Sequence, residues 1–330
     1  MDRWTTSDIP PQYGRTALVT GTGGLGYEDA LALARAGANV ILAGRDAGKG
    51  AAAVQRIRGA VPGADIVFAQ VDLGSLASIA ACGERLRASL PRIDMLVNNA
   101  GVMNPPERRT TVDGFELQFG TNHLGHFALT AELLPLLRRS DAPRVVTLSS
   151  VAARQGRFDF DDLQSERGYT PMAAYAQSKL ACLVFALQLQ RRSDANGWGL
   201  RSIAAHPGIS RTDLLPNGAG SDSAAGRARR WLWFLFQPAA HGAWPTLFAA
   251  TAPQAEGGAY YGPAYFGETR GAPSIARVPN RALDLGDAQR LWEVSEQLTG
   301  LRFDGSRGGR EYGTATSVAT SSRRHRALHG

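Results

Sequence analysis

The feature that most constrains the fold is a repeated alternation of short apolar runs and longer amphipathic stretches. The short runs are rich in Val, Ile, Leu and Ala, as expected for strands buried on both faces, and span residues 17–20, 39–43, 66–71, 95–98, 144–148, 201–205 and 259–261. Between them, stretches such as 27–36, 76–90, 115–137 and 173–192 have helical spacing. Strand–helix–strand repetition requires right-handed crossovers and a parallel sheet. The sequence therefore predicts an α/β fold, with one doubly wound domain, seven parallel strands and helices on both faces.

Composition places the chain among ordinary globular proteins. Of its 330 residues 44% are hydrophobic and 20% are charged, which excludes a disordered, collagenous or coiled-coil chain. Cys82 and Cys182 are the only cysteines, which excludes a disulfide scaffold and indicates a reducing compartment. The first twenty residues hold no apolar signal-peptide core, and no apolar run approaches the roughly 18 residues of a membrane span. We expect a soluble, cytoplasmic protein without a transmembrane segment.

The formal net charge of +7 raises the question of nucleic-acid binding. The charge is thinly spread, and part of it lies in an arginine-rich tail at 303–330. The sequence has no zinc-finger or RNA-binding signature, and its six histidines have no metal-binding spacing, so we expect neither a nucleic-acid partner nor a metal. We divide the chain into an N-terminal leader at 1–14, one domain at 15–302 and a disordered basic tail at 303–330.

A glycine-rich turn follows the first predicted strand directly. Gly21, Gly23 and Gly26 satisfy the G-x-G-x-x-G pattern between a strand and a helix. Glycines there permit a tight turn and a close approach of backbone to a pyrophosphate, and the helix N-terminus offers free N–H groups to the phosphates. The alternative is a glycine-rich turn without a ligand, but the strand–turn–helix context favours a dinucleotide site.

The end of the second strand bears on the choice between NADP and NAD. Arg45, 19 residues after Gly26, offers a planar guanidinium suited to the 2′-phosphate of NADP(H). Asp46 beside it is the residue type that bonds the 2′-hydroxyl of NAD(H) instead. We expect NADP(H), with NAD(H) as the alternative and a merely solvated Arg45 as the option without function. Asp72 and Leu73 end the third strand, where the carboxylate serves either the adenine or a helix N-cap.

A pair of titratable residues lies on the predicted helix 173–192. Tyr175 and Lys179 are four residues apart and share a helix face. A neighbouring ammonium stabilises a phenolate, which suits a general acid/base, although the Y-x-x-x-K pattern alone is common. Other polar residues follow the fourth, fifth and sixth strands, where ligands bind in such folds: Asn98, Asn99, Ser149, Ser150 and His206. The sequence assigns His206 no role.

This combination resembles the short-chain dehydrogenase/reductase family over nearly the whole chain, especially its retinol-dehydrogenase-like and WW-domain-oxidoreductase-like branch. Asn122-His123-Leu124-Gly125-His126-Phe127 and Asp161-Asp162-Leu163 are phrases similar to that branch. The resemblance implies a Rossmann fold and the catalytic residues Ser150, Tyr175, Lys179 and Asn122. Ser150 is preferred to Ser149 because the family motif uses the residue nearer the loop. The implied cofactor-binding residues are Gly21, Thr22, Gly23, Gly24, Leu25, Gly26, Arg45, Asp72, Leu73, Asn98, Ala100, Gly101, Tyr175, Lys179, Pro207, Gly208 and Thr212.

Two features depart from the family pattern. The glycine turn is one residue shorter than the usual T-G-x-x-x-G-x-G, because only Thr22 and Gly23 separate Gly21 from Gly24. The shorter form is similar to the loop of insect alcohol dehydrogenases, so we expect cofactor binding, with one position fewer near the 2′-phosphate. Ser150 and Tyr175 are 25 residues apart, which is wider than usual and predicts a solvated loop over the substrate cleft.

The function that follows is an NADP(H)-dependent oxidoreductase that interconverts an alcohol and a ketone or aldehyde. The alternatives are a sugar-nucleotide epimerase or dehydratase, which shares the Tyr–Lys pair, and a non-catalytic NADP(H)-binding scaffold. Within a substrate-binding segment at about 210–250, residues 226–236 couple arginines to aromatic residues and suggest a lipophilic substrate. This stretch fits a lid, a dimer contact, a peripheral membrane contact or core packing. The resemblance implies a homodimer or homotetramer.

Overall fold

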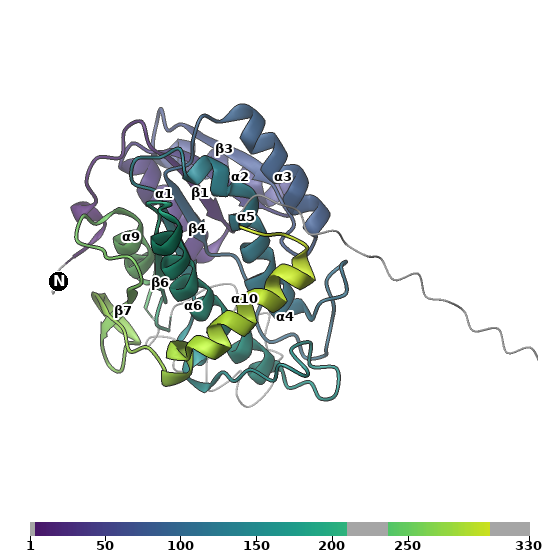
Figure 1. The fold of residues 1–330 in the computed structure, drawn as a ribbon. Coiled ribbons are helices and arrows are strands. Elements are labelled where there is room, and N and C mark those ends of the chain that lie inside the picture. The colour runs from purple at the N-terminus through teal and green to yellow at the C-terminus, as the bar shows by residue number, and fades with distance from the viewer. Residues whose placement is uncertain (1–3, 210–236, 304–330) are drawn as a thin grey trace, which may run out of the picture.

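One eight-stranded sheet forms the core of the protein (Figure 1). The computed structural model describes residues 4–209 and 237–303. The strand order is β3-β2-β1-β4-β5-β6-β7-β8, and all neighbours from β3 to β7 pair in parallel. The strands are β1 (Thr16–Thr20), β2 (Asn39–Gly44), β3 (Ile66–Gln70), β4 (Met95–Asn98), β5 (Arg144–Leu148), β6 (Arg201–Ala205), β7 (Tyr260–Tyr265) and β8 (Arg270–Ile275). The doubly wound α/β fold is therefore confirmed.

The eighth strand corrects the prediction of seven parallel strands. β8 pairs antiparallel with β7, with Tyr261 opposite Ile275, and forms an edge of the sheet. The sequence of β8 includes Gly271 and Pro273, two residue types that are depleted in strands. The sequence pattern therefore favours a loop at these residues. Proline is tolerated at an edge because its missing N–H need not pair with another strand. The sheet is mostly parallel, with one antiparallel edge.

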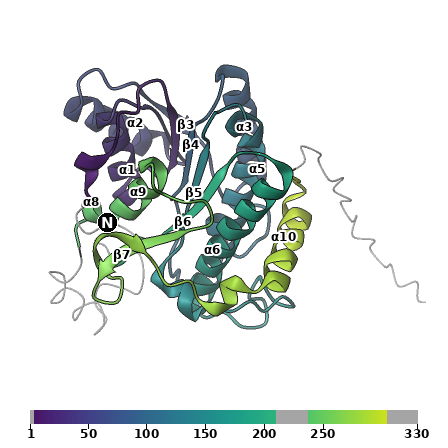
Figure 2. The same ribbon diagram turned by 60° about the vertical axis from the view of Figure 1, so that its left-hand side comes forward.

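Helices cover both faces of the sheet (Figure 2). One face packs against α1 (Gly24–Arg35), α2 (Ala47–Ala60), α8 (Ala239–Gly242) and α9 (Trp244–Thr251). The other face packs against α3 (Leu76–Ser89), α5 (Gly125–Leu137) and α6 (Pro171–Asn196), and α10 (Leu285–Thr299) packs on α6. The predicted helix 115–137 is divided into α4 (Leu117–Phe119), the π-helical turn η2 (Gly120–Leu124) and α5. Shorter 3-10 turns are η1 (Thr6–Asp8), η3 (Val151–Gln155) and η5 (Asn280–Leu283). The stretch 226–236 lies outside the described residues.

Both ends of the described chain pack onto the domain more closely than the sequence predicts. Trp4 of the leader is buried, and its ring centroid lies 5.5 Å from that of Phe248 in α9. Phe303, placed in the tail by the sequence, is buried against Phe127 and Trp292. The packed domain therefore includes Phe303, because this ring completes an aromatic cluster between α5, α6 and α10.

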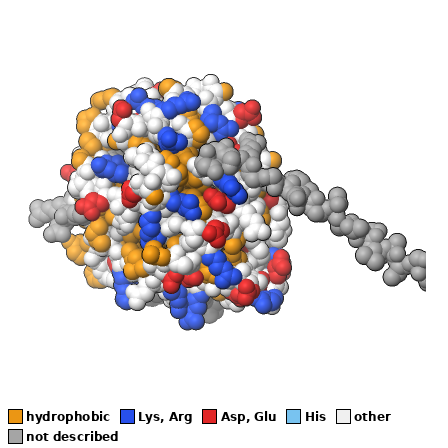
Figure 3. Space-filling model, viewed as in Figure 1, with side chains coloured by type: hydrophobic (Ala, Val, Ile, Leu, Met, Phe, Trp, Pro, Cys, Tyr) orange, Lys and Arg blue, Asp and Glu red, His pale blue; other side chains and the backbone are white. Residues whose placement is uncertain are grey.

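The long helix α6 is a core element. It is the one helix of residues 4–209 and 237–303 that is long and apolar enough to cross a membrane, and 89% of its most apolar window is buried inside the fold. It contacts β5, β6, η3 and α10. Its apolar composition is therefore explained by packing within the domain. On the face shown in Figure 3, basic and acidic side chains are interspersed rather than gathered by sign.

Candidate active site

The predicted site residues gather at the carboxyl ends of the parallel strands, around two cavities. The first, of about 560 Å³, is lined among others by Gly21, Thr22, Arg45, Asp72, Leu73, Ala100 and Gly101. The second, of about 540 Å³, is lined among others by Leu25, Ser150, Tyr175, Pro207 and Gly208. This is where a doubly wound sheet binds its ligands. Thr212 lies outside the described residues.

The glycine turn is tightly closed although it is one residue shorter than the family pattern. Gly21 has a φ of 101°, which is accessible chiefly to glycine, and its N–H donates to Ala43 O at 2.7 Å. A Cβ on Gly26 would collide with the carbonyl oxygen of Gly21. Helix α1 begins at Gly24, and its N-cap, Gly23, provides no side-chain cap. The first-turn N–H groups therefore remain available to a phosphate group.

Cations line the first cavity from several elements. Arg45 follows β2, Lys49 lies in the first turn of α2, and Arg109 comes from the loop between β4 and α4. Asp46 is the N-cap of α2, and its Oδ1 accepts from Lys49 N at 2.9 Å. This hydrogen bond is the main reason that the pKa of Asp46 is lowered from its usual value of 3.8. Asp46 therefore caps α2 while it also lines the first cavity, where its single negative charge stands against the three cations.

Asp72 and Asn98 have structural partners. Asp72 Oδ1 accepts from Gly74 N at 2.9 Å, whereas the N-cap of α3 is Ser75, so Asp72 shapes a turn and does not cap the helix. Asn98 is 1% exposed, and its Nδ2 donates to Thr130 Oγ1 at 3.1 Å. It does not line either of the two cavities. The prediction that Asn98 lines the cofactor site is therefore not met in this structure, where its side chain bonds Thr130 of α5, whereas Ala100 and Gly101 line the first cavity.

Tyr175 and Lys179 lie one turn apart on α6, as predicted. Their exposed fractions are 7% and 6%. Lys179 Nζ donates to Leu148 O at 3.0 Å, which ties the ammonium to the end of β5. A Cβ on Gly101 would lie 3.6 Å from Lys179 Nζ and 3.0 Å from Asn122 Oδ1. The bare backbone at Gly101 therefore leaves room for both side chains beside the cavity that it lines.

Asn122 lies in the π-helical turn η2, which the sequence pattern does not reveal. Its Oδ1 accepts from Val102 N at 2.8 Å, and its Nδ2 donates to Val102 O at 3.0 Å and to Ser178 Oγ at 2.9 Å. Its main-chain oxygen lies 2.9 Å from His126 Nδ1. Burial lowers the pKa of His126 to about 4, so this imidazole is neutral. Asn122 thus holds the loop after β4 against α6, next to Lys179.

The two serines after β5 have different surroundings. Ser149 is 3% exposed and its Oγ donates to Lys179 O at 2.7 Å. Ser150 is partly exposed, and its Oγ accepts from Ala152 N at 3.2 Å as the N-cap of η3. The hydroxyl proton of Ser150 is not used in that bond and is available to a ligand in the second cavity. This geometry favours Ser150, the residue preferred from the sequence.

Several residues around the cavities were not predicted from sequence. Lys49 follows Arg45 by four residues on a helix, a spacing that could have indicated it. Arg109 could not be found in this way because it reaches the site on a long irregular loop. The second cavity is also lined by Met103, Arg154, Met172, Ile209, Gly267 and Thr269. Gly267 and Thr269 come from the β7–β8 hairpin, and the sequence pattern does not predict β8.

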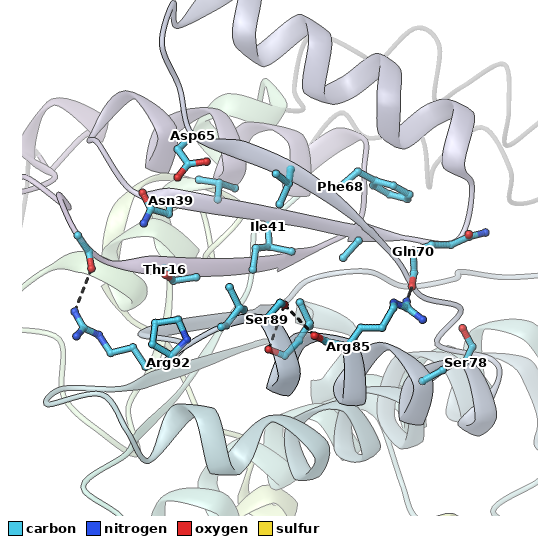
Figure 4. A pocket seen from close by; sticks show the side chains of 18 residues that line it. Thr16, Asn39, Ile41, Asp65, Phe68, Gln70, Ser78, Arg85, Ser89 and Arg92 are labelled. Atoms are coloured by element: carbon cyan, nitrogen blue, oxygen red, sulfur yellow. Dashed lines mark hydrogen bonds between the residues drawn. The ribbon is translucent and has the colours of Figure 1, made fainter.

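A third cavity, of about 800 Å³, lies between α3 and strands β1 to β3 (Figure 4). Arg85 and Arg92 line it, but both are bound to main-chain oxygens, those of Gln70 at 2.8 Å and Gly14 at 3.1 Å. None of the predicted catalytic or cofactor-binding residues lines this cavity. It is therefore separate from the candidate active site.

Comparisons with known proteins agree with this geometry. A family model described as short chain dehydrogenase matches residues 15–219. Polyprenol dehydrogenase of Mus musculus is 41% identical over 313 residues, covering 93% of this chain and 89% of that protein. Retinol dehydrogenase 13 of Homo sapiens is 40% identical over 294 residues, covering 87% of this chain and 85% of that protein.

Solved structures show the same fold. A crystal structure of a protein from Mycobacterium paratuberculosis matches with a TM-score of 0.76 and 40% identity, over 91% of this chain and 98% of that one. A short chain dehydrogenase from Shigella flexneri, complexed with NADP, matches with a TM-score of 0.60 and 26% identity, over 77% of this chain and 98% of that one. The chain therefore belongs to the short-chain dehydrogenase/reductase family of nicotinamide-dependent oxidoreductases, in its retinol-dehydrogenase-like branch.

Proposed function

We propose that this protein is an NADP(H)-dependent oxidoreductase that interconverts a lipophilic alcohol and its aldehyde or ketone, with Tyr175 as acid/base. The observation that carries the proposal is the joint position of Ser150 and Tyr175 on one cavity wall, with Lys179 one helical turn behind. The tight glycine turn lies at the same edge of the sheet. These groups form an acid/base beside a dinucleotide site.

The residues present fit a nicotinamide dinucleotide. The first turn of α1 offers its N–H groups to the pyrophosphate, and Pro207 and Gly208 line the cavity that contains Tyr175. When bound, the nicotinamide would accept a hydride from the alcohol or donate one to the carbonyl. We assign the 2′-phosphate to Arg45, Lys49 and Arg109, because Asp46 caps α2. The NADP complex of the Shigella flexneri relative supports this preference.

The proton chemistry rests on this chain's own side chains. During oxidation the phenolate of Tyr175 takes the hydroxyl proton of the alcohol, and during reduction the phenol returns it. The ammonium of Lys179, held by Leu148 O, stabilises the phenolate. Ser150 Oγ donates a hydrogen bond to the substrate oxygen and orients it toward Tyr175. Proton transfer and orientation of the substrate oxygen are therefore both assigned to side chains that line the second cavity, Tyr175 and Ser150.

The substrate class follows from the second cavity and from the relatives. Leu25, Met103, Met172 and Ile209 provide apolar wall, and methionines adapt to flexible apolar ligands. Relatives that match over most of the chain are named for retinol and polyprenol, both isoprenoid alcohols. We therefore assign the protein an uncharged, lipophilic alcohol or carbonyl. A sugar-nucleotide substrate would require polar partners in place of these side chains.

A panel of lipophilic alcohols, offered with NADP⁺ or with NAD⁺, tests the proposal. Formation of reduced nicotinamide with the isoprenoid alcohols, faster with NADP⁺, is expected. Arg45→Gln should weaken NADPH binding about tenfold, the equivalent of one charge-assisted hydrogen bond, and leave NADH binding unchanged. The exposed Arg35→Gln on α1, away from both cavities, is the matched control. Equal losses with both cofactors would contradict the assignment to the 2′-phosphate, and tight cofactor binding without any turnover would favour a scaffold.

A further inference from the structure

A fully buried imidazole joins the end of β6 to the β7–β8 hairpin. His206 is 0% exposed. Its Nδ1 accepts from Gly208 N at 3.2 Å, so the ring proton is on Nε2, which donates to Glu268 Oε2 at 2.9 Å. Burial lowers the pKa of His206, although Glu268 opposes the shift. The neutral ring thus fixes the backbone of Gly208 and connects it to a carboxylate of the hairpin.

Glu268 connects three parts of the cavity wall. Its Oε2 also forms an ion pair with Arg154 Nη2 at 2.5 Å, and its Oε1 accepts from Arg277 N at 2.9 Å. Arg154 belongs to η3, the turn that Ser150 caps. Glu268 has a φ of 68°, a strained value for a residue other than glycine. The strained backbone conformation therefore lies at the residue whose carboxylate binds both the imidazole of His206 and the guanidinium of Arg154.

Close backbone contacts hold the same arrangement. A Cβ on Gly262 of β7 would collide with the imidazole of His206, and a Cβ on Gly208 would collide with the carbonyl oxygen of Thr269. Ile209 N donates to Thr269 O at 3.0 Å. The segment 206–209 thus lies directly on the hairpin, with room for the imidazole only because position 262 has no side chain.

We propose that Arg154, Glu268 and His206 form a latch that positions Pro207 and Gly208 against the turn that begins at Ser150. The proposal rests on the proposed function, because Pro207 and Gly208 line the nicotinamide end of the site only if the cofactor binds there. Glu268 and His206 act through these neighbours and are positioning residues. Glu268 also neutralises the guanidinium of Arg154, which lines the second cavity, and so keeps that cavity suited to uncharged substrates.

The latch predicts a selective effect on one half of the cofactor. Glu268→Ala should weaken NADPH binding about tenfold and lower kcat by about 10- to 100-fold, since small misplacements at a reacting centre have effects of this size. Binding of 2′,5′-ADP, which carries only the adenosine half, should be unchanged because the first cavity is separate. Glu268→Gln keeps an acceptor for His206 Nε2–H and should lose less NADPH affinity and less kcat than Glu268→Ala. Arg270→Ala, on the same hairpin with its guanidinium over Phe266, is the control and should match wild type.

The charge of Arg154 provides a second readout that a purely structural role would not produce. Glu268→Gln should lower the KM for a carbonyl substrate with a terminal carboxylate, relative to its uncharged analogue, because Arg154 becomes available to the cavity. If Glu268→Ala fails to fold, Arg154→Met keeps the His206–Glu268 pair and should reduce kcat with 2′,5′-ADP binding unchanged.

If Glu268→Ala weakens the binding of NADPH and of 2′,5′-ADP to the same extent, or weakens neither, the latch is overturned. These binding measurements need no turnover, so they are independent of the proposed acid/base. Failure of the proposed acid/base role would instead appear as wild-type turnover by Tyr175→Phe.

Discussion

Replacing Asp29 by Asn should stabilise the protein increasingly as the pH rises. Asp29 lies on α1 with 0% exposure, and neither of its carboxylate oxygens has a hydrogen-bond partner within the described structure. Burial raises the pKa of Asp29 well above its ordinary value of 3.8, and the nearby Glu28 adds to the effect. The folded protein therefore keeps a proton at Asp29 that the unfolded chain releases once the pH exceeds that ordinary value.

Proton linkage gives the magnitude. Between the ordinary pKa and the raised pKa, wild-type folding takes up one proton, so the free energy of unfolding falls by about 1.4 kcal/mol per pH unit. Asn has nearly the same shape and cannot ionise. The free energy of unfolding of Asp29→Asn, relative to wild type, should therefore increase by about 1.4 kcal/mol per pH unit. Urea unfolding from about pH 5 to about pH 8 measures the difference, with exposed Glu84→Gln on α3 as control. A difference between Asp29→Asn and wild type that stays constant with pH would show that folding takes up no proton at Asp29.

Two further substitutions test the glycine turn and the aromatic cluster. A Cβ on Gly26 would meet the carbonyl oxygen of Gly21 and lie 2.6 Å from Asn99 Nδ2, so Gly26→Ala should weaken NADPH binding about tenfold in a fluorescence titration. Unchanged binding would show that the turn can widen. Trp292 is 2% exposed, so Trp292→Ala should lower the free energy of unfolding by about 3–5 kcal/mol, whereas the exposed Glu293→Gln should leave it unchanged. A loss below about 1 kcal/mol in urea unfolding would contradict the placement of Trp292 in the core.

Local periodicity was enough to predict most of the fold and the position of Tyr175 and Lys179 on one helix face. Buried parallel strands are continuous apolar runs, so all seven parallel strands are visible in the sequence. Tyr175 and Lys179 are recognisable because a helix brings residues four apart onto one face. The glycine turn is visible because its context, between a strand and a helix, is local as well.

Features that depend on distant contacts could not be predicted in this way. β8 contains Gly271 and Pro273 and exists because β7 provides a partner at the sheet edge. Arg109 reaches the first cavity on a loop whose course is set by tertiary hydrogen bonds, such as Asp113 Oδ2 accepting from Leu76 N at 2.7 Å. The same holds for Glu268, which meets His206 from 62 residues away. Pairings of this kind leave no periodic pattern in the sequence.

Tyr175 is the proposed proton-transfer residue at the nicotinamide site, and Tyr175→Phe tests this role most directly. The phenyl ring keeps the shape of the cavity wall and removes only the hydroxyl. NADPH titration and turnover of a lipophilic alcohol should be measured on the same preparation, beside wild type. We predict nearly unchanged NADPH binding with turnover reduced by at least about 100-fold. Turnover at the wild-type rate would show that Tyr175 is not the acid/base.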